Sequence, residues 1–276
     1  MDRRGPFRCG SWRPPIVKFC VLASGSSGNA ALLATATTRI LVDAGLSLRE
    51  LTRRLAAIGE QPETLSAIVV THEHSDHIAG LTRLARYLAH RNVKAPVFFT
   101  HRTAAAIDWN GHPPPLETFQ AGARFPVGDI EVQSFTIPHD AADPVGFCFQ
   151  TQGLKIAVAT DLGYLTESVK YHLRGAHMLL LESNHDLEML KVGPYPWSVK
   201  QRVMSRVGHL SNDSMRDFLL HDFDASTGHL ILGHLSEQNN HPEIVRMMAT
   251  EALGRRGLPT RFEIASQKQP TGVFEY

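Results

Sequence analysis

Cysteine is scarce in this sequence of 276 residues, in which only Cys9, Cys20 and Cys148 occur and no C-x-x-C spacing is found. An odd number of isolated cysteines in a long chain argues against a disulfide framework and predicts a reducing compartment. Cys20 and Cys148 lie in apolar, strand-like runs, so we expect both to be small core residues. The scarcity also argues against a structural zinc site, which favours thiolate ligands.

Long apolar runs are missing as well. No run approaches the roughly 18 residues that a transmembrane helix needs, so no membrane span and no membrane partner are predicted. Arg3 and Arg4 resemble the start of a twin-arginine signal, but no apolar segment follows them before Lys18. Residues 1–15, rich in arginine and proline, are therefore expected to be a disordered extension of a soluble, cytoplasmic protein.

A strong charge of one sign is also absent. Lysine and arginine number 28 against 27 aspartate and glutamate, which gives a formal net charge of +1. No global field attracts nucleic acid or a membrane, so any basic binding surface must be local. The hydrophobic share of 43% is enough to bury a full core. Because no linker-like or low-complexity stretch divides the chain, residues 16–276 are expected to form a single domain.

Histidine, by contrast, is abundant, and four potential metal ligands crowd into residues 71–77 (THEHSDH). This segment follows the apolar run 67–70, which is typical of a buried strand. As packing residues, these side chains would carry unsatisfied polar atoms into a core. A metal site at the end of the strand satisfies all of them.

The apolar patterns elsewhere predict a layered α/β protein. Strands are expected over residues 16–22, 30–34, 39–42, 67–71, 97–99, 130–137, 145–151, 154–159, 177–181, 229–232, 261–265 and 272–275. Helices are expected over residues 48–58, from 81 onward, and over 103–109, 168–173, 197–206, 213–221 and 242–253. Ligand-type side chains recur just past the strand ends, at Asp43, His72, His139, Asp161, His185 and His234. Because sites in layered α/β proteins collect at such edges, we expect these strands to assemble one site.

The pattern H-x-H-x-D-H, followed by a later histidine, an aspartate and a last histidine, resembles the signature of the metallo-β-lactamase fold superfamily. The resemblance covers the chain from about Pro15 to Tyr276. It implies an αββα sandwich, in which two mixed sheets pack face to face with helices outside. It also implies two divalent metal ions, of zinc or manganese with iron as a further option, and the following ligands: His72, His74 and His139 for one ion, Asp76, His77 and His234 for the other, and Asp161 between them.

Further runs resemble the YycJ-like branch of that superfamily, which is related to the RNase Z and RNase J phosphodiesterases. They are residues 22–30 (LASGSSGNA), 138–141 (PHDA), 144–147 (PVGF), 159–163 (ATDLG), 182–186 (ESNHD), 208–212 (GHLSN) and 232–236 (LGHLS). The branch implies exonucleolytic cleavage of DNA, in which a hydroxide bridging the metals attacks the scissile phosphate. Asp76 would then help to orient the nucleophile.

Other polar residues near the strand ends are candidates for supporting roles. His209, at the start of a helix with Ser211 and Asn212, suits proton donation to the leaving oxygen or a hold on the phosphate. An ordinary capped helix with a surface histidine is the alternative. The loop with Ser27 and Asn29 is expected either to cradle a phosphate or to be a plain hairpin turn. His185 belongs either to the substrate site or to a satisfied loop, and Asp43 is expected to orient the histidine segment.

Two alternatives to a nuclease stay open at this point, a small-molecule hydrolase and a binding module without catalysis. A hydrolase of small molecules would act on a thioester, as glyoxalase II does, or on a cyclic phosphodiester, and a binding module would keep only a vestigial site. Processing of tRNA is not expected, because only 22 residues separate His139 from Asp161 and leave no room for an RNA-binding arm. DNA is favoured over RNA, and the oligomeric state, including a homo-oligomer, is open. A basic strip at the site would support DNA, formed by Arg83, Arg86, Arg91, Lys200, Arg202 and Arg206.

Overall fold

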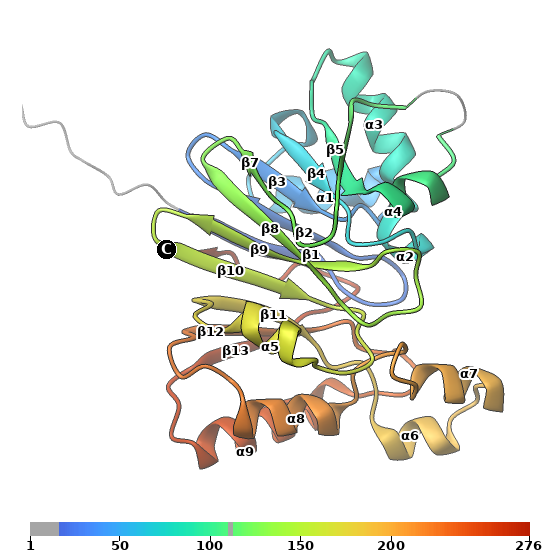
Figure 1. Cartoon of the computed structure of the whole chain (residues 1–276), viewed down its shortest axis with the longest axis vertical. Coiled ribbons are helices and arrows are strands. Elements are labelled where there is room, and N and C mark those ends of the chain that lie inside the picture. Colours follow the sequence, from blue (N-terminus) through green and yellow to red (C-terminus); the bar gives the residue numbers. More distant parts are fainter. Residues whose placement is uncertain (1–16, 110–112) are drawn as a thin grey trace, which may run out of the picture.

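The computed structural model describes residues 17–109 and 113–276, so the extension predicted over residues 1–15 lies outside the described part. Two seven-stranded mixed sheets pack against each other, and helices cover their outer faces (Figure 1). This arrangement confirms the predicted αββα sandwich. Within the described residues, no helix is long and apolar enough to cross a membrane.

The first sheet has the strand order β14-β1-β2-β3-β4-β5-β6. Its strands are β1 (Lys18–Ala23), β2 (Ala30–Ala34), β3 (Arg39–Val42), β4 (Ala67–Val69), β5 (Val97–Thr100), β6 (Leu116–Phe119) and β14 (Phe274–Glu275). The second sheet has the order β13-β12-β11-β10-β9-β8-β7. Its strands are β7 (Arg124–Val127), β8 (Ile130–Thr136), β9 (Val145–Thr151), β10 (Leu154–Ala159), β11 (Met178–Glu182), β12 (His229–Gly233) and β13 (Arg261–Ile264).

The helices lie mainly on the outer faces of the two sheets (Figure 1). In chain order they are α1 (Leu48–Ala57), the 3₁₀ turn η1 (Pro62–Thr64), α2 (Ser75–Ile78), α3 (Leu81–His90), α4 (His101–Ala106), α5 (Glu167–Leu173), α6 (Leu187–Val192), α7 (Trp197–Val203), α8 (Asn212–His221) and α9 (Pro242–Arg255). Leucines of α1 and α3 pack on the first sheet, and apolar residues of α5, α8 and α9 pack on the second.

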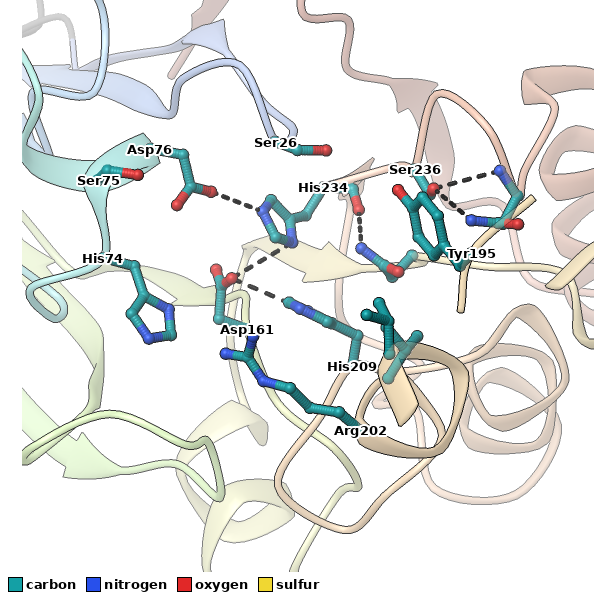
Figure 2. Close-up of a pocket in the computed structure, with 14 residues that line it drawn as sticks. Ser26, His74, Ser75, Asp76, Asp161, Tyr195, Arg202, His209, His234 and Ser236 are labelled. Carbon is teal, nitrogen blue, oxygen red and sulfur yellow. Dashed lines mark hydrogen bonds and ion pairs between the residues drawn. The ribbon is translucent and has the colours of Figure 1, made fainter. Parts of the chain in front are cut away.

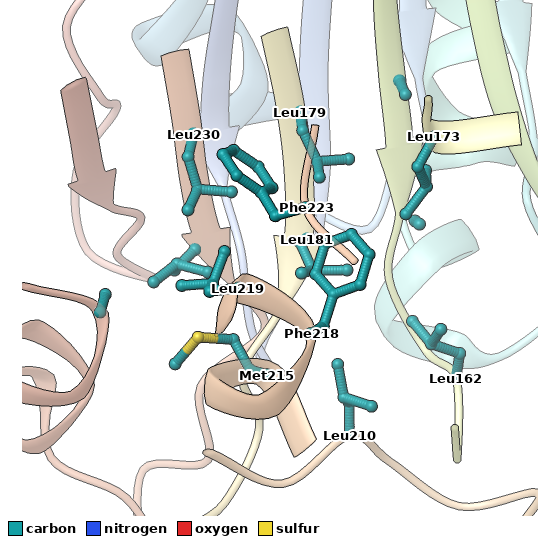
Figure 3. Packing of buried hydrophobic residues seen from close by; sticks show 14 of the residues in the cluster. Leu162, Leu173, Leu179, Leu181, Leu210, Met215, Phe218, Leu219, Phe223 and Leu230 are labelled. Atoms are coloured by element: carbon teal, nitrogen blue, oxygen red, sulfur yellow. The ribbon is translucent and has the colours of Figure 1, made fainter. Parts of the chain in front are cut away.

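The central strands are apolar on both faces because each face is covered. In β1, Phe19 and Val21 point into the layer between the sheets, whereas Cys20 and Leu22 face the helices outside. Such continuous apolar runs are typical of strands buried on both sides. Figure 3 shows the corresponding outer layer of the second sheet, where Phe223 lies near Leu179 and Leu230. Cys20 and Cys148 are buried and unbridged, as predicted.

Most predicted elements are confirmed to within a few residues, including the hairpin of β9 and β10. Two strands were missed, β6 and β7, which are edge strands with mostly exposed side chains. Apolar and polar residues alternate only weakly in these two strands, because little of either strand is buried. Pro126 in β7 is tolerated only because the strand lies at an edge. The short helices α2 and α6 were also missed.

Three residues that stand one or two positions after strands adopt left-handed backbone conformations. Asp43, Asp161 and His234 have φ values of 60°, 61° and 56°. These values are uncommon for residues other than glycine, and such backbone strain clusters at functional sites. The turns place all three side chains at the same edge of the sandwich, where the histidine segment also lies.

Candidate metal centre

The predicted ligands come together from both sheets. The histidine segment leaves β4 and continues into α2, while His139, Asp161 and His234 follow β8, β10 and β12. These segments are far apart in sequence, and they meet because the strands end at one edge of the sandwich. Figure 2 shows His74, Asp76, Asp161 and His234 around a common cavity.

One group of ligand atoms belongs to His72, His74 and His139, whose atoms all lie within 4.8 Å of one another. His139 Nε2 lies 3.2 Å from His74 Nδ1. The other ring nitrogen of His139, Nδ1, donates to the carbonyl oxygen of Gly208 at 3.0 Å. The proton is therefore on Nδ1, and the lone pair on Nε2 can bind a metal. Backbone anchoring of this kind is typical of histidines that bind metals.

A second group contains Asp76, His77, Asp161 and His234, again with ligand atoms within 4.8 Å of one another. His77 Nε2 lies 3.2 Å from Asp161 Oδ2, and His234 Nε2 lies 3.3 Å from Asp76 Oδ2. Asp161 is almost completely buried between the histidines. The structure therefore brings together all seven residues predicted as metal ligands. Asp161 and His234 also belong to a third, overlapping group with Glu182 and His209.

Asp43 orients the histidine segment through three contacts. Its carboxylate accepts the Nδ1 proton of His77 at 2.8 Å and the backbone N–H of Thr71 at 2.8 Å. It also accepts a hydrogen bond from Thr71 Oγ1 at 2.9 Å. Because the Nδ1 proton of His77 is held by Asp43, its Nε2 is directed at Asp161. This geometry supports the orienting role expected for Asp43.

Glu182, at the end of β11, is a site residue to which the sequence analysis assigned no role. Its Oε1 atom lies 2.8 Å from Nδ1 of both His209 and His234. Its Oε2 atom accepts the backbone N–H groups of Leu162 and Leu210 at 2.9 and 3.1 Å. The signal was present, since a glutamate ends a buried apolar strand just as the recognised ligands follow theirs.

Burial and charge act in opposite directions on these groups. Burial disfavours the charged form of His234, but the carboxylates of Asp161, Asp76 and Glu182 outweigh it and raise the pKa to about 10. Burial would raise the pKa of Glu182, yet His209 and His234 lower it to about 2. The pKa of Asp161 is likewise held well below its usual range, against burial, by His234 and His77. Protons on histidine thus balance buried carboxylates, a role that a divalent cation would take over.

The residues present fit a divalent metal ion. In the described part of the chain, the buried atom His72 Nε2 has no hydrogen-bond partner, and Asp161 Oδ2 has only its ion pair with His77. Such an orphaned buried atom is rare and requires an explanation. Burial also lowers the pKa of His72 well below its usual value, which keeps its lone pair available. Imidazole and carboxylate donors without thiolate suit zinc, and also manganese or iron.

A cavity of about 400 Å³ opens beside the two ligand groups. His209 lines it together with His74, Asp76, Asp161 and His234 (Figure 2). The ring centroid of His209 lies 5.1 Å from that of His139 and 5.2 Å from that of His234. Since Glu182 holds Nδ1, the second ring nitrogen of His209 is available to a molecule in the cavity. The predicted catalytic residues Asp76 and His209 therefore both lie at the cavity.

The loop with Ser27 and Asn29 reaches the cavity through a neighbouring residue. The cavity is lined by Ser26 and not by Ser27, whose backbone N–H donates to Gln267. Asn29 is buried, and its side chain bonds Gly25, Asp76 and His77. Asn29 thus fixes the turn and holds Asp76 in place, so the geometry favours this role over contact with substrate.

The other predicted substrate residues also lie away from the cavity. Ser211 caps α8, and Asn212 is fully buried, where it bonds Ser183 and Asn240. His185 is buried too, and within the described residues neither of its ring nitrogens has a hydrogen-bond partner. Ser211 and Asn212 therefore give α8 an ordinary capped start. Of residues 208–212, only His209 lines the cavity.

The basic strip that would have supported DNA is not assembled at the cavity, and the scattered positions favour the alternative of a small substrate. Arg83, Arg86 and Arg91 lie on or next to α3, on the first sheet, and Arg91 pairs with Glu63. Lys200 is buried and donates to the carbonyl oxygen of Lys191. Of the six residues in the strip, only Arg202 lines the cavity.

Comparison with known proteins gives the class to which this fold and site belong. A family model described as "Beta-lactamase superfamily domain" matches residues 38–256. A solved structure of the metallo-beta-lactamase fold protein YhfI from Bacillus subtilis covers 94% of the chain with a TM-score of 0.71, at 17% identity and over 100% of its own length. The chain belongs to the beta-lactamase superfamily, and its fold is the metallo-β-lactamase fold.

Two relatives define the branch within that family. The chain is 40% identical to "Exodeoxyribonuclease YycJ" of Bacillus anthracis over 266 residues, which cover 92% of the chain and 97% of the relative. It is 36% identical to "Exodeoxyribonuclease WalJ" of Streptococcus pneumoniae over 246 residues, which cover 87% of the chain and 90% of the relative. The predicted resemblance to the YycJ-like branch is confirmed. The family and the ligand groups together indicate a hydrolase that binds divalent metal.

Proposed function

We propose that this protein is an exodeoxyribonuclease that depends on two divalent metal ions. The observation that carries the proposal is the convergence of seven ligand-type side chains, in two groups, beside one open cavity. The proposal is supported by the 40% identity to Exodeoxyribonuclease YycJ along almost the whole of both chains. The catalytic unit is the single domain expected over residues 16–276.

Each proposed ion has its own protein ligands. His72, His74 and His139 would hold one ion, and Asp76, His77, Asp161 and His234 would hold the other. Asp161 would serve the first ion as well, as the resemblance to the superfamily implies. Divalent ions bound there supply Lewis acidity to a phosphate and make water a nucleophile at neutral pH. Zinc and manganese both suit this mixture of imidazole and carboxylate, with iron as a further option.

The protein's own groups position the reaction and move a proton. Asp76 lies at the cavity, where Asn29 Nδ2 donates to its Oδ2 at 3.1 Å, and its remaining lone pairs orient the attacking water. His209 is held through Nδ1 by Glu182 and presents Nε2 to the cavity. From this position His209 donates a proton to the leaving oxygen as a general acid.

The test is a panel of substrates assayed with Mn²⁺, Zn²⁺ and Mg²⁺ in turn. End-labelled single- and double-stranded DNA and RNA are compared with bis-p-nitrophenyl phosphate and a thioester. We expect stepwise shortening of DNA from one end, with slower degradation of RNA. Hydrolysis of the thioester alone would show a small-molecule hydrolase and overturn the proposal.

A further inference from the structure

One wall of the cavity is formed by the segment from Gly193 to Val203, which we call the α7 wall. Tyr195, Val199, Arg202 and Val203 of this wall line the cavity. The wall consists of α7 and its connection to α6, and it lies near α6 at one corner of the molecule (Figure 1). Tyr195 and Arg202 approach the ligand groups from this side (Figure 2).

The α7 wall exposes apolar and aromatic surface. Trp197 is 62% exposed and Val199 is 37% exposed, and Val192 just before the wall is 85% exposed. Within residues 17–109 and 113–276, the rings of Tyr195 and Trp197 stack on no other aromatic ring or cation. Exposed apolar surface that is contiguous with a polar cavity marks an interaction site.

The backbone holds these two rings in a fixed direction. Tyr195 stands between Pro194 and Pro196, and Pro196 is the N-cap of α7, which begins at Trp197. Proline fixes its own φ and restricts the residue before it. Rings displayed on a stiff backbone lose little conformational entropy on binding, which favours a binding role.

The same wall supplies the cation of the cavity. Among the described residues that line the cavity, Arg202 is the only lysine or arginine. Its side chain is ion-paired with Asp140, next to the ligand His139, and extends toward Asp161 (Figure 2). A guanidinium presents a planar fork of donors that matches phosphate as well as it matches carboxylate. The wall thus joins aromatic faces to one phosphate-binding group.

We propose that the α7 wall binds the unpaired end of a nucleic-acid strand, with bases stacked on Tyr195 and Trp197 and a phosphate held by Arg202. The inference rests on the proposed nuclease function and specifies the form of its substrate. Base–aromatic stacking requires an accessible base face, which an unpaired strand offers and an intact duplex hides. The wall therefore selects a single strand or a frayed end over a blunt duplex.

The experiment measures binding separately from cleavage. The full chain, loaded with Mn²⁺, is titrated into a fluorescent phosphorothioate strand that resists cleavage, an abasic strand of equal length and a blunt duplex. Trp197→Ala and Tyr195→Ala should each weaken binding of the base-containing strand by about 5- to 150-fold, the range for loss of one stacked base. Binding of the abasic strand should change little. Wild type should bind the duplex at least about 10-fold more weakly than the single strand.

Tyr171→Ala is the matched control, because Tyr171 is 68% exposed on α5 and does not line the cavity. Thermal melts close to wild type are expected for Trp197→Ala and Tyr171→Ala, whose side chains are mostly exposed. Equal losses for base-containing and abasic strands, unchanged binding in both variants, or equal affinity for duplex would overturn the inference. Base-dependent binding here, together with no cleavage of the unmodified DNA and RNA strands in the substrate panel, would support the inference and contradict only the nuclease function.

Discussion

The carboxylate of Glu182 lies 2.8 Å from Nδ1 of His234. The same oxygen lies 2.8 Å from Nδ1 of His209, so one buried acid serves a candidate metal ligand and the proposed general acid. Because both Nδ1 protons are held on Glu182, both Nε2 atoms are directed at the cavity. The two backbone N–H groups that bond Oε2 fix the carboxylate itself.

Replacement of Glu182 tests whether this carboxylate orients His234 and His209. Glu182→Gln keeps the shape of the side chain but removes the charge that fixes the histidine protons. We expect metal affinity and strand cleavage to fall by about 10- to 100-fold, the range typical of groups that orient metal ligands. Affinity is measured by competition with a chelator. Glu188→Gln, at an exposed position on α6, should match wild type, and equal affinity in the two variants would contradict the role.

Asp43 offers a parallel test on the other ligand group. Asparagine tolerates the left-handed backbone that Asp43 adopts, so Asp43→Asn changes the charge without new backbone strain. The variant holds the Nδ1 proton of His77 less firmly, and metal affinity should fall by about 10- to 100-fold. Calorimetric titration with Zn²⁺ measures the change. An unaltered titration curve, with an unaltered melting temperature, would show that Asp43 does not orient His77.

His185 gives a prediction about pH. Burial lowers its pKa to about 4, whereas the unfolded chain has a value of about 6.5. Between these values the unfolded chain binds a proton that the folded chain excludes, so stability falls as pH drops through this window and is constant above it. The expected loss from pH 7.5 to 5 is about 2 kcal/mol. Urea unfolding gives the free energy of unfolding at each pH. Between pH 7.5 and 5 this free energy should fall by about 2 kcal/mol more for metal-free wild type than for His185→Leu. Equal falls in the two proteins would refute the assignment.

Two glycines differ in the space around them. A Cβ at Gly45 would lie 1.6 Å from the carbonyl oxygen of Asp76, so Gly45→Ala must displace the ligand segment. We expect a loss of about 3 kcal/mol in the free energy of unfolding. A methyl group added at Gly254, in α9, would meet no neighbouring atom within 4 Å, and Gly254→Ala should stabilise by about 0.5–1 kcal/mol. Denaturant titration compares the two, and equal effects would contradict this description of the packing.

Local patterns in the sequence were sufficient to predict a layered α/β protein with one site at its strand ends. The αββα sandwich and the two ligand groups were predicted from the resemblance to the metallo-β-lactamase fold superfamily. His139, Asp161 and His234 each stand just after an apolar strand, and strand ends meet at one edge. The cavity wall was harder to predict, since it depends on how α6 and α7 pack. Ser26 and Ser27 are neighbours of the same residue type, and only the conformation of the turn decides that Ser26 lines the cavity and Ser27 does not.

The same limit explains why Glu182 was overlooked and His185 was considered for the substrate site. Both stand at the end of β11, where the sequence shows two ionisable residues and not their directions. Side chains alternate between the faces of a strand only while the strand continues. Beyond the end of the strand, tertiary contacts decide where each side chain points. They place Glu182 against His234 and His185 in the interior.

The central claim is that the two ligand groups share Asp161 in a site that cleaves DNA. It is tested most directly by measuring the metal content and the cleavage of end-labelled DNA for wild type, Asp161→Asn and the exposed control Asp217→Asn, whose side chain is 63% exposed. We predict two ions per chain and stepwise cleavage for wild type and control. For Asp161→Asn we predict loss of bound metal and at least about 100-fold slower cleavage. Full cleavage and unchanged metal content in Asp161→Asn would contradict the claim.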